Sequence, residues 1–425
     1  MMKLDWLSTC RPRMNEVAAR RLLEVFLLSL CLVCAPAARA GQGLPTRRNV
    51  AWSPHQAVSK RTASQGATSS VSSVSPISKA EFSRIVQDFS EEEGNFNSDN
   101  YVSNETSYLH VVDKLKQLGA TGGAYIGVGP EQNFSYIART RPQIAFIVDI
   151  RRQAIIQHLM YKAIFHLSTN RTQFLSWLFS KPLKGNDVPG RDAPIEDILE
   201  YFSQDPTNSV IFAENLAAIR KTIEKDFEIV LSPRDQKMLE HVYSTFQEAN
   251  LGITTRWYGN GYGGDFYGPS LKDLLLEKDL NGKMGSFLST AEDYDFLREL
   301  HRKNRIIPVV GDFAGSKALA AVANYLRENG YTVSAFYTSN VEQYLYGDRV
   351  FGAFTENVRK LPIDDKSVFI RATRIGWQGH PAHVPGHRMT TLLEKIAVFL
   401  NDYDQGLYPD YWSMITTHYI AGGRP

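Results

Sequence analysis

Residues 123–149 read GAYIGVGPEQNFSYIARTRPQIAFIVD, and this stretch decides the fold. The run 123–128 is short, apolar and ends in glycines, residues 131–140 can form a helix, and 144–149 is a second apolar run. A strand, a glycine turn, a helix and a second strand in close succession make the βαβ unit of a doubly wound parallel sheet. The stretch therefore predicts an α/β protein.

The same alternation of strands and helices returns near the C-terminus. Predicted strands lie at 286–289, 305–311, 331–338 and 366–374, and predicted helices at 291–303, 316–328 and 390–401. Earlier helices are predicted at 105–118 and 151–167. Residues 171–255 contain helical patterns at 171–180, 194–203, 209–227 and 234–250 with no clear strand between them. We expect a mostly parallel, Rossmann-like sheet with a helical insertion at about 171–255.

The N-terminal region has the pattern of an export signal. The chain has 425 residues and three cysteines, all within the first 34 positions. Two arginines precede an apolar run at 22–35, and the small residues AxA follow at 38–40, which is typical of a secretory signal peptide. An uncleaved membrane anchor is the alternative, although the run is short for a span. Arg20 and Arg21 also resemble a twin-arginine signal, and Met14 is an alternative start.

Domain boundaries follow from this interpretation. We expect residues 1–40 to be a signal peptide, 41–78 a Ser/Thr-rich flexible linker, and 79–425 a single exported, periplasmic or secreted α/β domain with no stable membrane span. Ser78 followed by Glu81 predicts the N-cap of the first helix. Without the signal peptide the chain has no cysteine, which excludes disulfides and thiolate catalysis.

The charge balance argues against a polyanionic partner. The sequence has 47 Lys and Arg against 45 Asp and Glu, a formal net charge of +2. A nearly neutral chain gives no electrostatic reason to expect a nucleic acid, so we expect a small-molecule substrate. The sequence also lacks a Walker loop, a G-x-S-x-G elbow and an H-E-x-x-H zinc motif.

The glycine turn and the acid after the second strand suggest a ligand site. Ligands of such sheets bind beyond the carboxyl ends of the strands, where the strand order reverses. Gly127 and Gly129 leave room for a ligand to approach the backbone, and Asp149 ends the second strand where a carboxylate can bind a ribose diol. A structural turn with a surface aspartate is the alternative.

These residues resemble the class I S-adenosylmethionine-dependent methyltransferase fold. The resemblance extends from residues 124–129 and 146–150 to 306–312 and 326–337, which are similar to that family's fourth and fifth strands. It implies that Gly127, Gly129, Glu131 and Asp149 contact S-adenosylmethionine, and that Asp312 and Phe313 border the methyl-transfer pocket.

Two departures qualify the resemblance. Tyr125 stands where the family often has an acid, and Pro130 and Glu131 stand where its third glycine is expected. A negative Glu131 at a helix start opposes a pyrophosphate more than it opposes a sulfonium ligand, which favours S-adenosylmethionine over a dinucleotide. Export argues the other way, because the cofactor is a cytoplasmic metabolite.

Other candidate residues complete the predicted site. Asp312 and Glu342 are the candidate bases for methyl transfer, Asn340 can orient a substrate, and Trp257 and Tyr258 open an aromatic, glycine-rich loop that can cover it. A capping box formed by Ser339 and Glu342 is the structural alternative. His380, His383 and His387 lie close together, but nearby prolines and glycines prevent a helical arrangement, so we predict no metal site.

Three functions remain open from the sequence. The first is a methyltransferase-like enzyme that binds S-adenosylmethionine or a related nucleoside and transfers a methyl group to a small molecule. The second is a non-catalytic exported binding or scaffold protein on the same fold. The third is an NAD-dependent oxidoreductase.

Overall fold

The computed structural model describes residues 74–203, 209–257, 266–374 and 379–423. All of these residues belong to one compact unit of the chain. The expected signal peptide and most of the expected linker lie outside the described residues. Within the described ranges, no helix combines the length and the apolar character that a membrane crossing requires.

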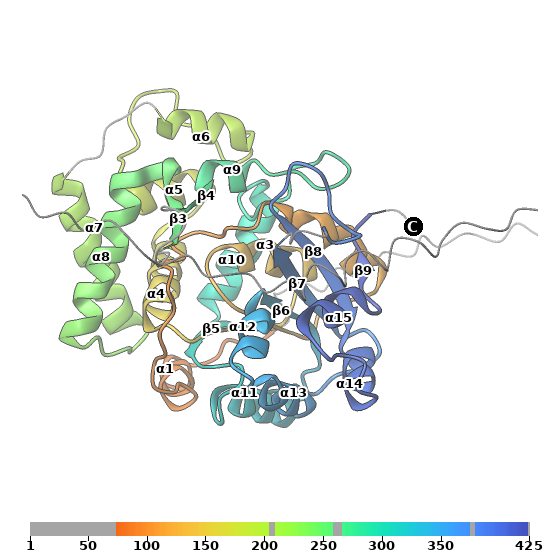
Figure 1. Cartoon of the computed structure of the whole chain (residues 1–425). Helices are drawn as coiled ribbons and strands as arrows, with labels where there is room; N and C mark the ends of the chain where they lie inside the picture. Colours follow the sequence, from red (N-terminus) through yellow and green to blue (C-terminus); the bar gives the residue numbers. More distant parts are fainter. Residues whose placement is uncertain (1–73, 204–208, 258–265, 375–378, 424–425) are drawn as a thin grey trace, which may run out of the picture. The chain divides into compact units, whose positions relative to one another are not determined.

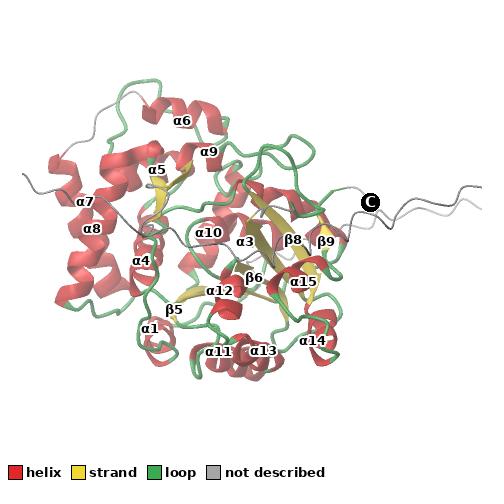
Figure 2. Cartoon of the chain, viewed as in Figure 1, coloured by secondary structure: helices red, strands yellow, loops and turns green. Residues whose placement is uncertain are grey.

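A seven-stranded, mostly parallel sheet forms the centre of the fold (Figure 2). Its order is β5-β2-β1-β6-β7-β8-β9, in which β5, β2, β1, β6 and β7 are parallel and β8 and β9 are each antiparallel to the preceding strand. The strand bounds are β1 (Ala124–Gly127), β2 (Ile144–Asp149), β5 (Ile306–Val310), β6 (Val333–Ser339), β7 (Val368–Arg374), β8 (Met389–Lys395) and β9 (Ile420–Ala421). The predicted α/β class with a doubly wound sheet is confirmed.

The quoted stretch forms the predicted βαβ unit. Strand β1 pairs in parallel with β2, and α3 (Gln132–Thr140) connects them. Both strands are buried along their whole length, which explains their continuous apolar runs. The chain adds β2 and β5 on one side of β1 and then crosses to β6 on the other side, so the strand order reverses between β1 and β6.

Three predictions in the later half were wrong. Residues 306–310 and 333–339 are the third and fourth strands of the sheet along the chain, whereas the resemblance had placed them fourth and fifth. Residues 286–289 form turns, not a strand. The predicted helix 390–401 begins as β8, because residues 389–394 are buried in a strand that pairs with β7 and β9, and only α14 (Ile396–Asp404) is helical.

Helices cover both faces of the sheet (Figure 1). One face carries η2 (Thr106–Val111), α2 (Val112–Gln117), α3, α4 (Arg152–Leu167) and α10 (Ala291–Arg302). The other face carries α1 (Lys79–Asp88), α11 (Ala318–Glu328), α13 (Phe351–Arg359) and α14. Helix α1 begins at the predicted cap, where Ser78 Oγ accepts a hydrogen bond from the backbone N–H of Glu81.

The predicted helical insertion is present. It contains α5 (Arg171–Phe179), α6 (Ile195–Ser203), α7 (Ser209–Lys221), a π-helical turn (Thr222–Asp226) and α8 (Pro233–Ala249), and α5, α7 and α8 pack against α4. A short helical turn (Asn250–Gly252) leads into a two-stranded ribbon of β3 (Thr254–Trp257) and β4 (Phe266–Ser270), followed by α9 (Leu271–Leu275). Helices α12 (Val341–Gly347) and α15 (Tyr411–Thr416) complete the described elements.

Candidate functional site

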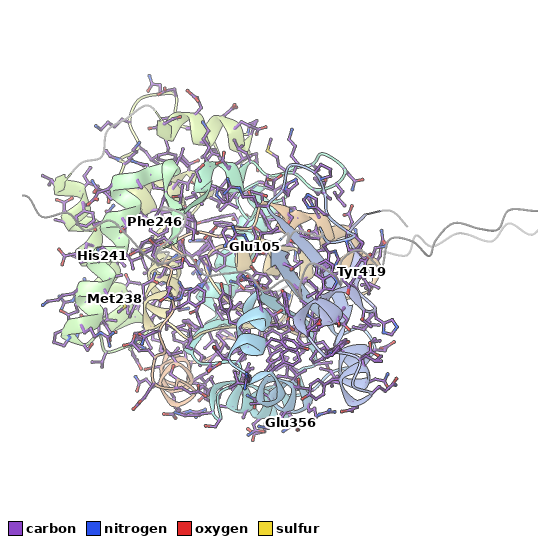
Figure 3. The ribbon with its side chains drawn as sticks, viewed as in Figure 1. Glu105, Met238, His241, Phe246, Glu356 and Tyr419 are labelled. Carbon is purple, nitrogen blue, oxygen red and sulfur yellow. The ribbon has the colours of Figure 1, made fainter. Side chains whose placement is uncertain are left out.

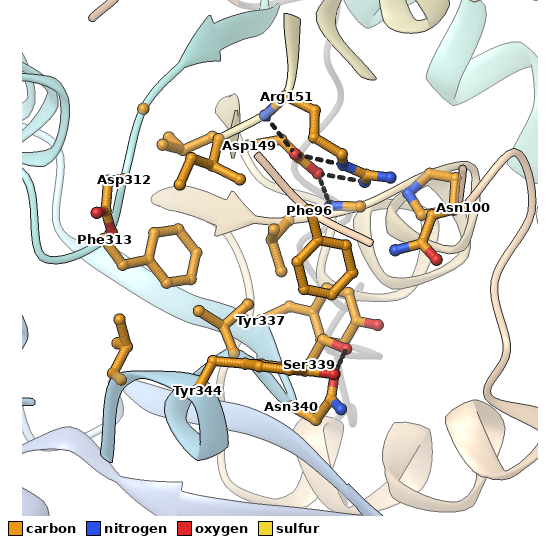
Figure 4. Close-up of a pocket in the computed structure, with 18 of the residues that line it drawn as sticks. Phe96, Asn100, Asp149, Arg151, Asp312, Phe313, Tyr337, Ser339, Asn340 and Tyr344 are labelled. Carbon is orange, nitrogen blue, oxygen red and sulfur yellow. Dashed lines mark hydrogen bonds and ion pairs between the residues drawn. The ribbon is translucent and has the colours of Figure 1, made fainter. Parts of the chain in front are cut away.

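A cavity of about 310 Å³ lies beyond the carboxyl ends of the parallel strands (Figure 4). Its walls include Gly129 after β1, Asp149 at the end of β2, Asp312 after β5 and Asn340 after β6. These four strands flank the point where the strand order reverses, which is the usual ligand position in an open α/β sheet. The volume is within the range of small-molecule pockets.

The glycine turn is held by side chains of its own neighbourhood. Gly129 has φ +80°, which favours glycine, and its N–H donates to Asp149 Oδ2 at 3.2 Å. Gly127 does not line the cavity, and a Cβ there would clash with Asn133. Asn133 Nδ2 in turn donates to the carbonyl oxygens of Val128, Gly129 and Pro130. The turn therefore directs its N–H to a carboxylate of the protein.

The carboxylate of Asp149 is fully occupied by Arg151 and the turn (Figure 4). Oδ1 accepts from the backbone N–H and Nε of Arg151 at 2.9 and 3.0 Å, and Oδ2 accepts from Nη2 of Arg151 at 2.8 Å and from Gly129. A carboxylate has about four acceptor positions. Burial alone would raise the pKa of Asp149, but the Arg151 guanidinium outweighs it, so the pKa is lowered. A diol at Asp149 would have to replace these bonds.

Residues 90–104 form one wall of the cavity, which we call the wall segment. Asn95, Phe96, Asn100 and Asn104 of this segment line the cavity. Arg151 Nη1 donates to the carbonyl oxygens of Ser98 and Asp99 at 3.3 and 3.0 Å, which ties the middle of the segment to the end of β2. The wall segment and β2 are therefore joined through the same guanidinium that binds Asp149.

Glu91 anchors the start of the wall segment. Its Oε1 accepts from the backbone N–H groups of Lys317 and Ala318 at 2.7 and 2.6 Å, and its Oε2 accepts from that of Asp312 at 3.2 Å. A carboxylate at successive backbone N–H groups before a helix is a favourable electrostatic arrangement. The start of α11 thus binds an anion that the protein itself supplies.

Glu105 follows the wall segment and lies in the interior of the molecule (Figure 3). It is 0 % exposed, lines the cavity, and accepts hydrogen bonds from Tyr337 Oη at 2.9 Å, Gln132 Nε2 at 3.0 Å and Ser339 Oγ. Burial raises the pKa of Glu105, although the hydrogen bonds from Ser339, Gln132 and Tyr337 lower it in part. These hydrogen-bond partners are all neutral, so among the described residues this carboxyl group has no countercharge.

Two predicted acids are placed away from the cavity. Glu131 is buried beside a much smaller cavity and accepts from the backbone N–H of Ser103 at 3.2 Å, and burial raises its pKa to about 7. Glu342 is buried on α12 and forms an ion pair with Arg371 on β7, at 2.8 Å from Nε. Arg371 also pairs with Glu394 on β8. We call Glu342, Arg371 and Glu394 the ion-pair cluster.

The charges around the cavity are mainly negative. Among the described residues that line it, Glu105, Asp149, Asp312 and Asp348 carry carboxyl groups and Arg151 carries the one cationic group. Even with Glu105 protonated and Asp149 paired to Arg151, Asp312 and Asp348 leave a negative field. The cavity therefore favours a neutral or cationic ligand over a phosphate.

The structure brings together part of the predicted site. Gly129, Asp149, Asp312, Phe313 and Asn340 line the cavity, whereas Gly127, Glu131 and Glu342 do not. Trp257 belongs to β3, and Tyr258 lies outside the described residues.

Sequence reasoning missed the role of the wall segment, Glu105 and Tyr337. In the sequence, Glu105 is only the first residue of the helix predicted at 105–118, and Ser339 is only a candidate helix cap. In the structure Asn340 is the N-cap residue and has no side-chain capping bond, so the capping box was wrong. A signal was present at Tyr337 to Asn340, a polar stretch at the end of a buried strand.

The clustered histidines have structural partners. His380 Nε2 lies 2.9 Å from the carbonyl oxygen of Ile415, and His387 Nδ1 lies 2.9 Å from Thr106 Oγ1. Across the described residues, no group of three His, Cys, Asp or Glu side chains is arranged to hold a metal ion.

Comparison with known proteins assigns a family without an activity. No curated protein matches the chain. A family model described as "Domain of unknown function (DUF7790)" matches residues 100–249 and 208–405, which together exceed half of the chain and include most of the cavity. The chain therefore belongs to the DUF7790 family.

Proposed function

We propose that the cavity binds a small neutral or cationic ligand of the nucleoside class, with S-adenosylmethionine as the first candidate, and that methyl transfer to a small molecule is the associated reaction. The observation that carries this proposal is the position of a 310 Å³ cavity beyond the strand ends, at the reversal of strand order, with an excess of carboxyl groups. A sulfonium cation is complementary to that excess.

The apolar part of the cavity suits a flat base. Val128, Val148, Ile150 and Phe313 supply apolar surface, while the asparagines of the wall segment supply paired donors and acceptors. All acceptor positions of the Asp149 carboxylate are occupied in the structure. Ribose recognition by Asp149 therefore requires that Arg151 give up at least one of its hydrogen bonds to this carboxylate. Asp312 lines the cavity, and its Oδ1 accepts from the backbone N–H of Ala314, so Asp312 is the better placed of the two predicted bases.

The occupied Asp149 favours a second candidate, a binding or scaffold protein without catalysis on the same fold. A protein of this fold that had lost its original ligand would retain the glycine turn. An arginine of the same chain would then occupy the hydrogen-bonding positions of the aspartate, as Arg151 does at Asp149. A nicotinamide-dependent oxidoreductase ranks below both, because the Gly129 N–H is bonded to Asp149 and is not directed to a pyrophosphate.

Calorimetry on the purified chain tests the proposal. We expect S-adenosylmethionine or its demethylated product to bind, and Asn340→Trp, which places a large side chain on the cavity wall, to weaken binding at least tenfold. Asn324→Trp on the exposed surface of α11 is the matched control and should bind as the wild type does.

The outcomes separate the candidates. If neither ligand produces a heat of binding at millimolar concentration, the proposal fails and a non-catalytic binding or scaffold function is favoured. Binding of reduced nicotinamide cofactor, with quenching of its fluorescence, would instead favour the oxidoreductase.

A further inference from the structure

Ser339 lies on a turn that presents its hydroxyl group to the cavity. It is the last residue of β6, one residue separates it from the first residue of α12, and its φ is +53°, which L-residues rarely adopt. Ser339 is partly exposed and lines the cavity together with Asn340 (Figure 4). A strained strand-to-helix turn is also the geometry that exposes the nucleophile of α/β-hydrolases. The glycines of the G-x-S-x-G motif are absent, so no sequence pattern indicates it.

The hydroxyl group of Ser339 donates a hydrogen bond to a buried acid. Its acceptor is Oε1 of Glu105, a residue 234 positions earlier in the chain. Glu105 is fixed in turn by Tyr337 Oη at 2.9 Å and Gln132 Nε2 at 3.0 Å. A nucleophile bonded to a base that a third group orients is the arrangement of covalent catalysis.

The surroundings of Glu105 distinguish it from Asp149, the other buried acid that lines the cavity. Asp149 is paired with Arg151, which lowers its pKa and makes it a weaker base. Glu105 has only neutral partners among the described residues, and burial raises its pKa, which brings a carboxylate closer to the strength that a general base needs near neutral pH.

We propose that Ser339 is a nucleophile activated by Glu105, and that this pair forms an acyl-enzyme with a small ester whose charge is neutral or positive. A bond forms between Ser339 Oγ and the ester carbonyl carbon while the hydroxyl proton passes to Glu105. The bond from that carbon to the leaving oxygen then breaks, and the alcohol leaves with the proton from Glu105. Water then attacks the acyl carbon while Glu105 takes a proton from it, the bond from that carbon to Ser339 Oγ breaks, the proton on Glu105 returns to Ser339 Oγ, and the acid is released.

The cavity supplies two further requirements of this chemistry. Asn340 follows Ser339 on the cavity wall with its Oδ1 3.4 Å from Ser339 Oγ, and rotation of this amide would direct its Nδ2 to the oxyanion, which an asparagine amide can stabilise. The carboxyl groups of Asp312 and Asp348 disfavour an anionic ester. The roles of Ser339 and Glu105 do not depend on the binding of S-adenosylmethionine.

An uncharged fluorophosphonate ester tests the pair without knowledge of the substrate. Attack by Ser339 forms an oxygen–phosphorus bond and releases fluoride, so intact-mass and peptide mass spectrometry should find one adduct, on Ser339. Ser339→Ala should take up no probe. Ser339→Gly serves as the second variant, because glycine tolerates the positive φ and keeps the fold while removing the hydroxyl group.

The role of Glu105 has its own readout. In the wild type the labelling rate should rise with pH as Glu105 ionises, and Glu105→Gln should lower the rate at least tenfold and remove the pH dependence. Ser334→Ala, on the same strand but outside the cavity lining, is the control and should be labelled at the wild-type rate. The proposal is overturned by the absence of an adduct, by an adduct on another residue, or by an unchanged rate in Glu105→Gln.

The calorimetric and labelling results are independent of each other. A chain that binds S-adenosylmethionine without labelling supports only the proposed function. Labelling of Ser339 in a chain that does not bind the sulfonium supports only the nucleophilic role of Ser339.

Discussion

Glu105 at the cavity and the two glutamates of the ion-pair cluster are almost equally buried, but only the glutamates of the cluster have a countercharge among the described residues. Glu105 is 0 % exposed with hydroxyl and amide partners, whereas Glu342 and Glu394, each 1 % exposed, share the guanidinium of Arg371. Burial alone would lower the pKa of Arg371, but the two carboxylates raise it. Burial raises the pKa of Glu394 as it raises that of Glu105, but at Glu394 the Arg371 guanidinium opposes the rise, whereas at Glu105 only neutral hydrogen bonds do. The paired acids can therefore hold strands together through an ion pair, which Glu105 cannot.

The largest expected effect is on the ion-pair cluster. Arg371→Met should lower the free energy of unfolding by about 3–5 kcal/mol, because it leaves two buried carboxyl groups without a countercharge. Urea denaturation at pH 7 measures this difference. Arg359→Met is the matched control, since Arg359 pairs with Glu356 and Asp404 at the surface, and exposed pairs contribute about 0–1 kcal/mol.

The same experiment can contradict the comparison. If Arg371→Met and Arg359→Met lower the free energy of unfolding by the same amount, the ion-pair cluster contributes no more to stability than an exposed ion pair does. Addition of Glu342→Gln and Glu394→Gln to Arg371→Met should recover part of the loss, because the uncompensated charges are then removed.

Lys162 is a buried cation that has no acid partner among the described residues, and it is the counterpart of Glu105 with the opposite charge. Lys162 is 1 % exposed, and its Nζ donates a hydrogen bond to the carbonyl oxygen of His301. The same Nζ lies 4.5 Å from the ring centroid of Phe82 and 4.6 Å from that of Phe227. Burial lowers the pKa of Lys162 from 10.5 to about 7. Between these two values the unfolded chain holds a proton that the folded chain does not, so stability should rise with pH.

Lys162→Met should abolish this rise. The measurement is the free energy of unfolding at pH 7 and pH 9.5, and Lys272→Met, an exposed lysine, should keep the wild-type dependence. An equal rise with pH in Lys162→Met would show that another group causes it.

The smallest effect is expected at His418, which is more than half exposed. The hydrogen bond to Asp402 raises the pKa of His418, so its contribution to stability is complete below its ordinary pKa of 6.5 and is lost as pH rises through the folded value. His418→Gln should therefore be slightly less stable than the wild type at pH 5.5 and equal to it at pH 9. A difference that persists at pH 9 would assign the effect to packing.

The sequence predicted those parts of the site that are local along the chain. The glycine turn and Asp149 belong to one βαβ unit, whose strands and helix follow from periodicity. Glu105 and Ser339 could not be paired in this way, because 234 positions separate them and only the sheet brings them together. Strand β8 was predicted as helix because its six consecutive buried residues carry no alternating pattern, and its tertiary position decides its conformation.

The anchoring of Glu91 gives the wall segment a reporter on two residues that do not themselves line the cavity. The amide protons of Lys317 and Ala318 are bonded to a side chain 226 and 227 positions earlier, so their exchange with solvent depends on whether that side chain is docked. Their hydrogen-exchange rates would therefore record each detachment of the segment's start. Two backbone amides at the start of α11 thus provide a spectroscopic signal for opening of the cavity.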